Sequence, residues 1–277
     1  MKKKVLSSLL AMTMIVSVTA CSGAGGSAQS AEDSEQSAAE SADSDVEYIK
    51  SKGKLIVGIT DFEPMDYKDD SGNWIGFDAD MAKKVAESLG VECEFVEIDW
   101  DNKILELDNK SIDVVWNGMT LTDEVKKSME CTNPYLNNAQ VVVVPAADAD
   151  KYNTAESVAS LSFAVEAGSA GEAAATENKF EFISVASQSN AVMEVEAGTS
   201  GACIIDLLMA GAMVGPGTSY EGLTHTVELT TEEYGIGCRK GSDLAAYIND
   251  QLKASYDDGS MKKIAQTYGV QDALVAQ

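Results

Sequence analysis

The chain has 277 residues, with 20 Lys and Arg against 45 Asp and Glu, a formal charge of −25, and 45% apolar residues. A chain of this length and apolar content can bury one large core or two modest ones, which excludes disorder of the whole chain and a disulfide-stapled miniprotein. The negative charge repels phosphate backbones, and the sole basic cluster is at residues 2–4, so we expect no nucleic-acid partner.

An export signal is predicted at the start of the chain. The lysines at 2–4 precede an apolar run over residues 5–18, which is shorter than the roughly 20 residues that span a bilayer as a helix. The run ends at residues 18–21, VTAC, which resemble a bacterial lipobox. The resemblance implies a lipoprotein signal peptide at 1–20, lipidation of Cys21, and attachment to the extracytoplasmic face of the cell membrane through the lipid anchor only. Ordinary signal cleavage, with the cysteine incidental, is the alternative.

Residues 21–46 are rich in Ser, Ala, Gly and acidic residues and contain almost no large apolar side chain. Such a segment cannot form a core, so it is interpreted as an acidic linker, and we expect the fold to start near Val46. The four later cysteines lack CxxC spacing and lie in or beside apolar runs. We interpret them as small buried hydrophobic residues, although export permits a disulfide. No metal site and no cofactor motif is predicted.

Strand and helix patterns alternate through the rest of the chain. The first unit has strands at 55–59, 92–97 and 113–116, helices at 78–90, 103–109 and 122–129, and a valine run at 141–144; the second has strands at 162–165, 182–185 and 202–205 and helices from 170, at 189–197 and ending at 214. Strands separated by such helices predict parallel sheets covered on both faces, with ligands beyond the carboxyl ends of the strands. Two similar units indicate a cleft between them.

Five stretches carry a resemblance to a known family: residues 76–82 (GFDADMA), 113–122 (DVVWNGMTLT), 132–135 (TNPY), 167–169 (AGS) and 234–236 (YGI). In order and spacing they resemble the polar amino-acid-binding proteins of ABC importers, the bacterial extracellular solute-binding proteins of family 3.

The resemblance implies an α/β fold of the periplasmic-binding-protein type II, with two α/β lobes joined by a two-crossing hinge. Lobe one would comprise 47–142 plus 230–277, and lobe two 143–229. The crossings would lie at 141–144 and 226–230, and hinge closure around a ligand would follow.

The same resemblance implies a ligand-binding site. Asp206 would accept hydrogen bonds from a substrate ammonium, although an Asp between a strand and a helix also favours a capping role. Gly118 and Thr120 would follow a strand in a loop that offers a carbonyl to the ammonium and a hydroxyl to a carboxylate; a plain turn is the alternative. Gly168, Ser169 and Ala170 would present free N–H groups at a helix start, which favours an anion.

Three further side chains are candidates for the wall of the site. Phe62 matches an aromatic lid of the family, and Trp100 falls at a wall position, while both also fit a core role. Asn117 either offers its amide to the ligand or closes a turn.

One position departs from the family. Relatives have Arg where this chain has Val125, and that Arg binds the substrate α-carboxylate with two hydrogen bonds. Three outcomes remain open: the helix start suffices, Lys126 or Lys127 replaces the Arg, or the ligand has no α-carboxylate. The last outcome favours amines and other positive or net-neutral ligands.

The predicted function is the substrate-binding component of an ABC importer, which captures an amino acid or small amine and delivers it to a permease and ATPase complex. Two alternatives are a ligand-sensing lipoprotein for a receptor and a secreted dehydratase-like enzyme on the same fold. We do not expect an enzyme, since no nucleophile elbow, HExxH motif or phosphate loop is present and the single histidine, His225, fits a surface strand position.

Overall fold

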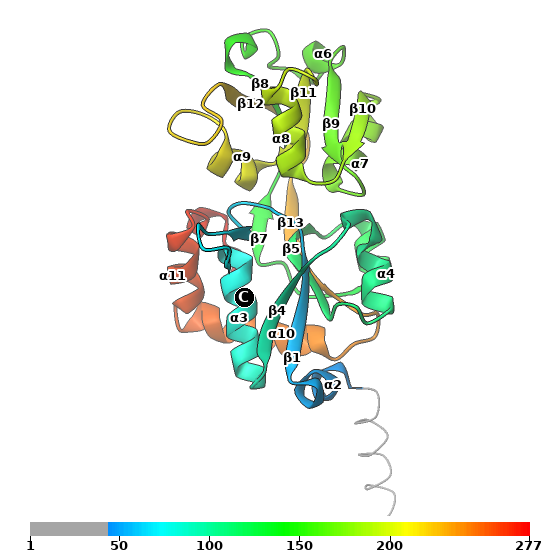
Figure 1. Ribbon diagram of the computed structural model, residues 1–277, viewed down its shortest axis with the longest axis vertical. Helices are drawn as coiled ribbons and strands as arrows, with labels where there is room; N and C mark the ends of the chain where they lie inside the picture. The colour runs from blue at the N-terminus through cyan, green and yellow to red at the C-terminus, as the bar shows by residue number, and fades with distance from the viewer. Residues whose placement is uncertain (1–43) are drawn as a thin grey trace, which may run out of the picture. The chain divides into compact units, whose positions relative to one another are not determined.

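In the computed structural model, which describes residues 44–277, helices and strands alternate along the chain and gather on two separate β-sheets (Figure 1). The family 3 expectation of a type II fold with two α/β lobes is met by this arrangement. The predicted signal peptide, Cys21 and most of the linker lie outside the described residues. No helix within 44–277 has the length and hydropathy needed to cross a membrane.

The first lobe is built on a six-stranded sheet of order β4-β1-β5-β13-β6, with β7 paired to β13. The strands are β1 (Lys54–Ile59), β4 (Glu92–Glu97), β5 (Val114–Thr120), β6 (Glu130–Cys131), β7 (Leu136–Asn138) and β13 (Glu232–Cys238). Its helices are α2 (Asp45–Lys52), α3 (Phe77–Leu89), α4 (Lys103–Asp108), α5 (Asp123–Ser128), α10 (Leu244–Asp257) and α11 (Ser260–Thr267), with short turns η1 (Trp100–Asn102) and η3 (Gln271–Ala273). A small hairpin joins β2 (Tyr67–Lys68) and β3 (Trp74–Ile75).

The second lobe is built on a five-stranded sheet of order β10-β9-β11-β8-β12. The strands are β8 (Gln140–Pro145), β9 (Ser162–Glu166), β10 (Glu181–Val185), β11 (Ala202–Asp206) and β12 (Leu223–Glu228). Its helices are α6 (Ala155–Val158), α7 (Ala170–Asn178), α8 (Gln188–Glu196) and α9 (Leu207–Met213), with the turn η2 (Ala146–Asp148).

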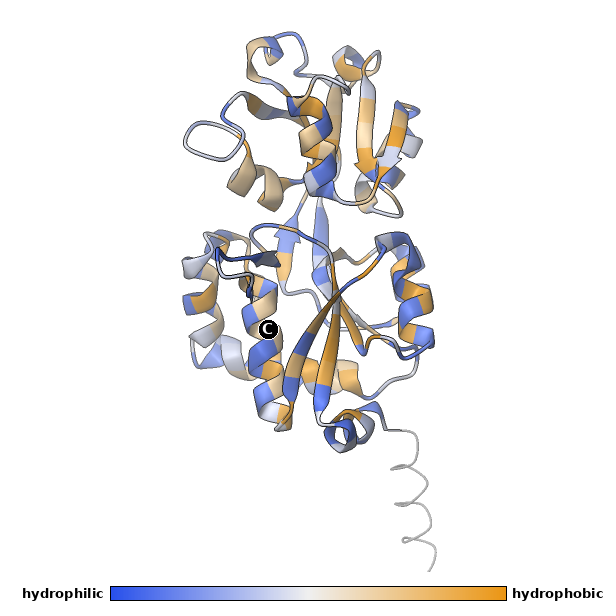
Figure 2. Cartoon of the chain, in the orientation of Figure 1, coloured by the Kyte–Doolittle hydropathy of each residue, from blue (hydrophilic) through white to orange (hydrophobic). Residues whose placement is uncertain are grey.

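The local sequence accounts for most of these elements. In α3, Met81, Val85 and Leu89 are buried on one face, and Gly90 ends the helix in a left-handed conformation with its N–H on the carbonyls of Ala86 and Glu87. Figure 2 shows this helix alternating between hydrophobic and hydrophilic turns, whereas β1 is largely hydrophobic because both of its faces are covered.

The expectation of wholly parallel sheets is wrong. In the first sheet β13 is antiparallel to β5, and in the second sheet β8 is antiparallel to β11. Both strands are entered directly from the other lobe, without a crossover helix, so each runs opposite to the parallel strands beside it. The valines at 141–144, expected as the first crossing, lie inside β8 and pair with β11 and β12.

Two residues assigned to the linker begin α2. Asp45 is buried, and its carboxylate accepts hydrogen bonds from Nε and Nη2 of Arg239 at 2.8–3.2 Å. Arg239 also contacts Asp113 at 3.5 Å, so this arginine stabilises the end of the first lobe. The four cysteines of the described region are free thiols; Cys203 and Cys238 are buried and the other two half-buried.

Candidate functional site

A cavity of about 680 Å³ lies where the carboxyl ends of β5, β9 and β11 meet the starts of their helices. All nine residues predicted for the ligand site line it: Phe62, Trp100, Asn117, Gly118, Thr120, Gly168, Ser169, Ala170 and Asp206. The lining comes from both lobes. The structure therefore brings together side chains that are up to 144 positions apart, while their roles toward a ligand stay predictions.

Asp206 ends β11 and is 3% exposed. It occupies the N-cap position of α9 but makes no capping hydrogen bond. Its carboxylate instead accepts hydrogen bonds from Gln140 Nε2 at 2.9 Å and Tyr234 Oη at 2.6 Å, and from the amides of Asn138 and Gln188. The structure thus decides against the capping alternative.

A second carboxylate, Glu232 at the start of β13, shares two of these donors, Asn138 and Gln140. Its Oε1 accepts from Asn138 Nδ2 at 2.6 Å, Gln140 Nε2 at 2.8 Å and Thr120 Oγ1 at 2.9 Å. Burial, and then the Glu232 charge, hold the pKa of Asp206 well above its usual value. The hydroxyl of Thr120, expected to face a ligand carboxylate, donates its hydrogen bond to Glu232 instead.

Sequence reasoning missed Asn138, Gln140 and Glu232. They lie where β7, β8 and β13 pass between the lobes. Polar side chains at the ends of buried strands are the available signal, but their convergence on Asp206 depends on antiparallel pairing that the local pattern does not reveal.

Asn117 and Gly118 lie within β5 and do not follow it, because antiparallel pairing with β13 continues to Thr120. Asn117 donates to Asp66 Oδ2 at 2.8 Å and accepts from Thr60 at 2.8 and 3.0 Å. The Asn117 amide therefore links β5 to Thr60, which follows β1, and to Asp66. Gly118 has φ +55°, and a Cβ there would lie 2.6 Å from the Phe62 ring.

Two buried carboxylates lie behind this strand. The Gly118 N–H donates to Asp78 Oδ2 at 2.7 Å, and Tyr135 Oη donates to the same oxygen at 2.7 Å. Asp66 and Asp78 are fully buried, and each has one oxygen with no hydrogen-bond partner among the described residues. Burial raises the pKa of Asp78 to about 7. Burial, and then the charge of Asp78, also raise the pKa of Asp66 well above its usual value.

The start of α7 is organised by its own side chains. The Ser169 hydroxyl accepts from Glu172 N at 3.1 Å, and the Gly168 N–H donates to Glu172 Oε2 at 2.8 Å. Glu172 thus already supplies negative charge to this helix start, which leaves less of the helix dipole for a ligand anion than the sequence suggested.

The aromatic candidates are buried and also line the cavity, so their core and wall roles coincide. Phe62 packs edge-on against Tyr234 with ring centroids 6.4 Å apart. Trp100 lies under the ammonium of Lys103, whose Nζ is 4.9 Å from the ring centroid.

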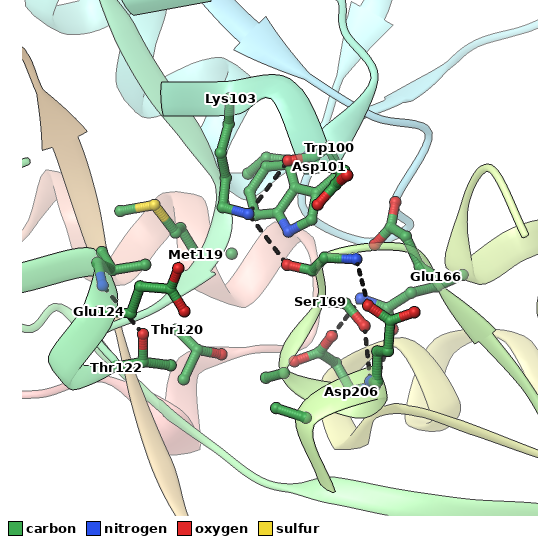
Figure 3. Close-up of a pocket in the computed structure, with 18 of the residues that line it drawn as sticks. Trp100, Asp101, Lys103, Met119, Thr120, Thr122, Glu124, Glu166, Ser169 and Asp206 are labelled. Atoms are coloured by element: carbon green, nitrogen blue, oxygen red, sulfur yellow. Dashed lines mark hydrogen bonds between the residues drawn. The ribbon is translucent and has the colours of Figure 1, made fainter. Parts of the chain in front are cut away.

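Lys103 is the single basic residue among the described residues that line the cavity, and it is 8% exposed. Its ammonium donates to the Trp100 carbonyl at 3.1 Å and, across the cleft, to the Gly168 carbonyl at 3.0 Å, as Figure 3 shows. Burial lowers its pKa against the opposing effect of nearby carboxylates.

Acidic side chains dominate the lining. Seven of its residues are acidic: Asp101, Asp123, Glu124, Glu166, Glu172, Glu177 and Asp206. Val125, the position at which the resemblance implies an Arg in the family, lines the cavity, whereas Lys126 and Lys127 are exposed and do not line it. The field in the cavity therefore favours a cationic ligand.

No group of three or more His, Cys, Asp or Glu side chains within residues 44–277 is arranged to hold a metal ion. His225 is exposed on β12, opposite Val143.

Comparisons with known proteins agree with this arrangement. The sequence model of the bacterial extracellular solute-binding proteins, family 3, matches residues 55–271. The L-cystine-binding protein TcyJ of Escherichia coli is 26% identical over 225 residues, which are 79% of this chain and 84% of TcyJ.

A solved mutant of ArgBP from T. maritima superposes with a TM-score of 0.76 at 31% identity and covers 81% of this chain and 98% of its own. A cyclohexadienyl dehydratase of Pseudomonas aeruginosa is 27% identical over 117 residues, 42% of this chain and 44% of its own.

Proposed function

The chain belongs to family 3 of the bacterial extracellular solute-binding proteins, and from this premise we propose that it captures an amino acid or a related small amine for an ABC importer. The lobes would close on the ligand, and the closed form would dock on the permease and ATPase complex. Tethering through lipidated Cys21 would hold the protein at the extracytoplasmic face of the membrane.

The observation that carries the proposal is the acid-lined cavity with Asp206 at its base. The resemblance to family 3 implies that Asp206 would face a substrate ammonium, and seven acidic residues against one buried lysine in the cavity lining favour a positive ligand. Val125 removes the usual carboxylate partner, so the ligand class includes amines without an α-carboxylate.

Two contacts across the cleft support lobe closure. Lys103 Nζ donates to the Gly168 carbonyl at 3.0 Å, and Ser189 Oγ donates to the Asp61 carbonyl at 3.1 Å. Each joins the first lobe to the second without using the groups at the base of the cavity.

Calorimetry with amino acids, their amides and the matching decarboxylated amines tests the proposal. We expect at least one positively charged compound to bind, and Asp206→Asn to weaken it by roughly 100-fold, because an uncompensated ammonium is then left in a buried site. Mass spectrometry of ligand released from the purified protein identifies the natural compound. Absence of binding by the whole panel, with no released ligand, would refute it.

The two alternatives use the same cavity and differ in the step after ligand binding. A receptor partner in place of a permease would indicate sensing, and a neighbouring permease and ATPase gene pair would argue against it. The partial match to a dehydratase makes catalysis testable: incubation with the bound compound should return it unchanged.

A further inference from the structure

Glu166, the last residue of β9, is a buried carboxylate. It is not among the ligand-site residues that the resemblance to family 3 implied. It lines the cavity, is 2% exposed, and its Oε1 has no hydrogen-bond partner within the described part of the chain. Figure 3 places it on the same side of the cavity as Ser169 and Asp206. Its neighbour in the sheet is β11, which ends at Asp206.

The spacing of the two carboxylates follows from the pairing of these strands. They are parallel, with Phe163 beside Ala202 and Ala164 beside Cys203. Continued along the strands, this register sets Glu166 beside Ile205, one residue before Asp206. Adjacent strands lie about 4.8 Å apart, so the two acids occupy neighbouring places at one edge of the sheet.

Glu166 forms no ion pair within residues 44–277. The ammonium of Lys103 is directed at the carbonyls of Trp100 and Gly168, and the side chains that face Glu166, Thr60 and Gln188, are neutral. Burial disfavours the ionised form of Glu166, and its Oε1 has no donor among the described residues, whereas four side chains donate to Asp206. A cation that enters the cavity would supply the missing partner.

We propose that Glu166 is a second cation-binding carboxylate beside Asp206, and that the ligand is a small aliphatic molecule with two cationic nitrogen groups. The inference rests on the proposed function and narrows its substrate class. A diamine and a diamino acid share this chemistry. A cavity of about 680 Å³ has room for either, and the exposed acids of its rim, Glu124 and Glu177, attract such a dication.

The test compares ligands that differ in one charge. Putrescine is matched with n-butylamine, and ornithine with norvaline, by calorimetry on the full chain. In one pair or both, we expect the compound with two cationic nitrogen groups, putrescine or ornithine, to bind about 100-fold more tightly than the compound with one. The pair with the larger difference shows whether the ligand is an amine or an amino acid.

Glu166→Gln keeps the shape of the side chain and removes its charge. We expect the preference for the dication to fall below about tenfold, while affinity for the monocation stays within about threefold. Glu181→Gln changes an exposed acid of the same lobe that does not line the cavity, so it is the matched control and should keep the preference. If Glu166→Gln folds poorly, Glu166→Leu gives the same readout without a buried polar group.

Tight binding of n-butylamine or norvaline, with no higher affinity for putrescine or ornithine, would overturn the inference and leave the proposed function intact. So would an unchanged preference in both Glu166 variants. Failure of every amine and amino acid to bind is a different result, and it would count against the proposed function.

Discussion

At Glu166, burial raises the pKa of the carboxyl to about 8, against the opposing charge of Lys103. The side chain also faces Thr60 and Gln188, and the Asp99 charge raises its pKa further. Glu166 is therefore mainly protonated at pH 7 until a cation binds beside it. A bound cation favours the ionised form and lowers this pKa, so binding should release a proton.

We predict that affinity for a dication rises between pH 6 and pH 8, because less free energy is then spent on removing that proton. The binding enthalpy at pH 7, measured in buffers of different ionisation enthalpy, should report proton release. Glu166→Gln should release fewer protons than the wild type, by up to about one. Equal release in both proteins would assign the proton to another group, such as Asp206, whose pKa is also raised.

Asp66 and Asp78 give a second prediction at the scale of single residues, this time for stability. Their pKa values are raised in the folded protein, so folding favours the protonated pair. The stabilisation of the folded protein by this protonated pair is fully present below about pH 4, the pKa of Asp in the unfolded chain. It is lost as the pH rises through about 7, the pKa of Asp78 in the folded protein.

Asp66→Asn removes one of the two like charges and keeps an oxygen for the Asn117 amide. We expect the free energy of unfolding to fall less between pH 5 and pH 8 in this variant than in the wild type, by about 2 kcal/mol, as measured by urea denaturation. Asp70→Asn, an exposed neighbour, should leave the pH dependence unchanged.

Among the elements, α5 shows why a missing arginine is not replaced by the lysines next to it. The Thr122 hydroxyl caps the helix by accepting from Val125 N at 3.1 Å, which directs Val125 into the cavity and leaves Lys126 and Lys127 exposed. Successive helical residues are about 100° apart, so a lysine at the next position leaves the helix in a different direction from Val125.

Val125→Arg should therefore restore a carboxylate partner. We expect the ratio of ornithine affinity to putrescine affinity to rise about tenfold or more, because the guanidinium binds a carboxylate with two hydrogen bonds and repels a second amine. Lys126→Arg adds the same group outside the cavity and should leave the ratio unchanged. A ratio that does not rise in Val125→Arg would show that ligands do not place a carboxylate at α5.

The elements also show how far sequence patterns reach. The strand at 92–97 was predicted at its observed bounds, and α3 and α4 within one residue, because each is set by local periodicity and end signals. The antiparallel course of β8 and β13 was missed, since it depends on which lobe each strand enters from, and no residue within the strands encodes that.

In the whole molecule, the two lobes approach each other closely at Gly168. This residue has φ +69°, and a Cβ there would lie 2.7 Å from Asp101 Oδ1 and 2.8 Å from Asp101 Cα. Under the proposed closure, Gly168→Ala should keep the lobes apart and weaken ligand affinity by about tenfold or more.

Small-angle scattering with and without ligand measures the closure. We expect the decrease in radius of gyration on ligand addition to be smaller in Gly168→Ala than in the wild type. Gly198→Ala is the matched control, since Gly198 has φ +70° but no atom within 4 Å of an added Cβ. Equal closure in all three proteins would refute the role of this contact.

The sequence by itself determined the α/β character through local periodicity, and the family through motifs of short span. The resemblance to that family then implied nine of the residues that line the cavity. The tertiary structure alone decided the partners of each carboxylate. Asp206 is surrounded by donors from β7, β8, α8 and β13, while Glu166 has none on its buried oxygen among the described residues. The physical reason is that hydrogen bonding and burial depend on segments distant in the chain, whose approach is set by strand order and lobe packing.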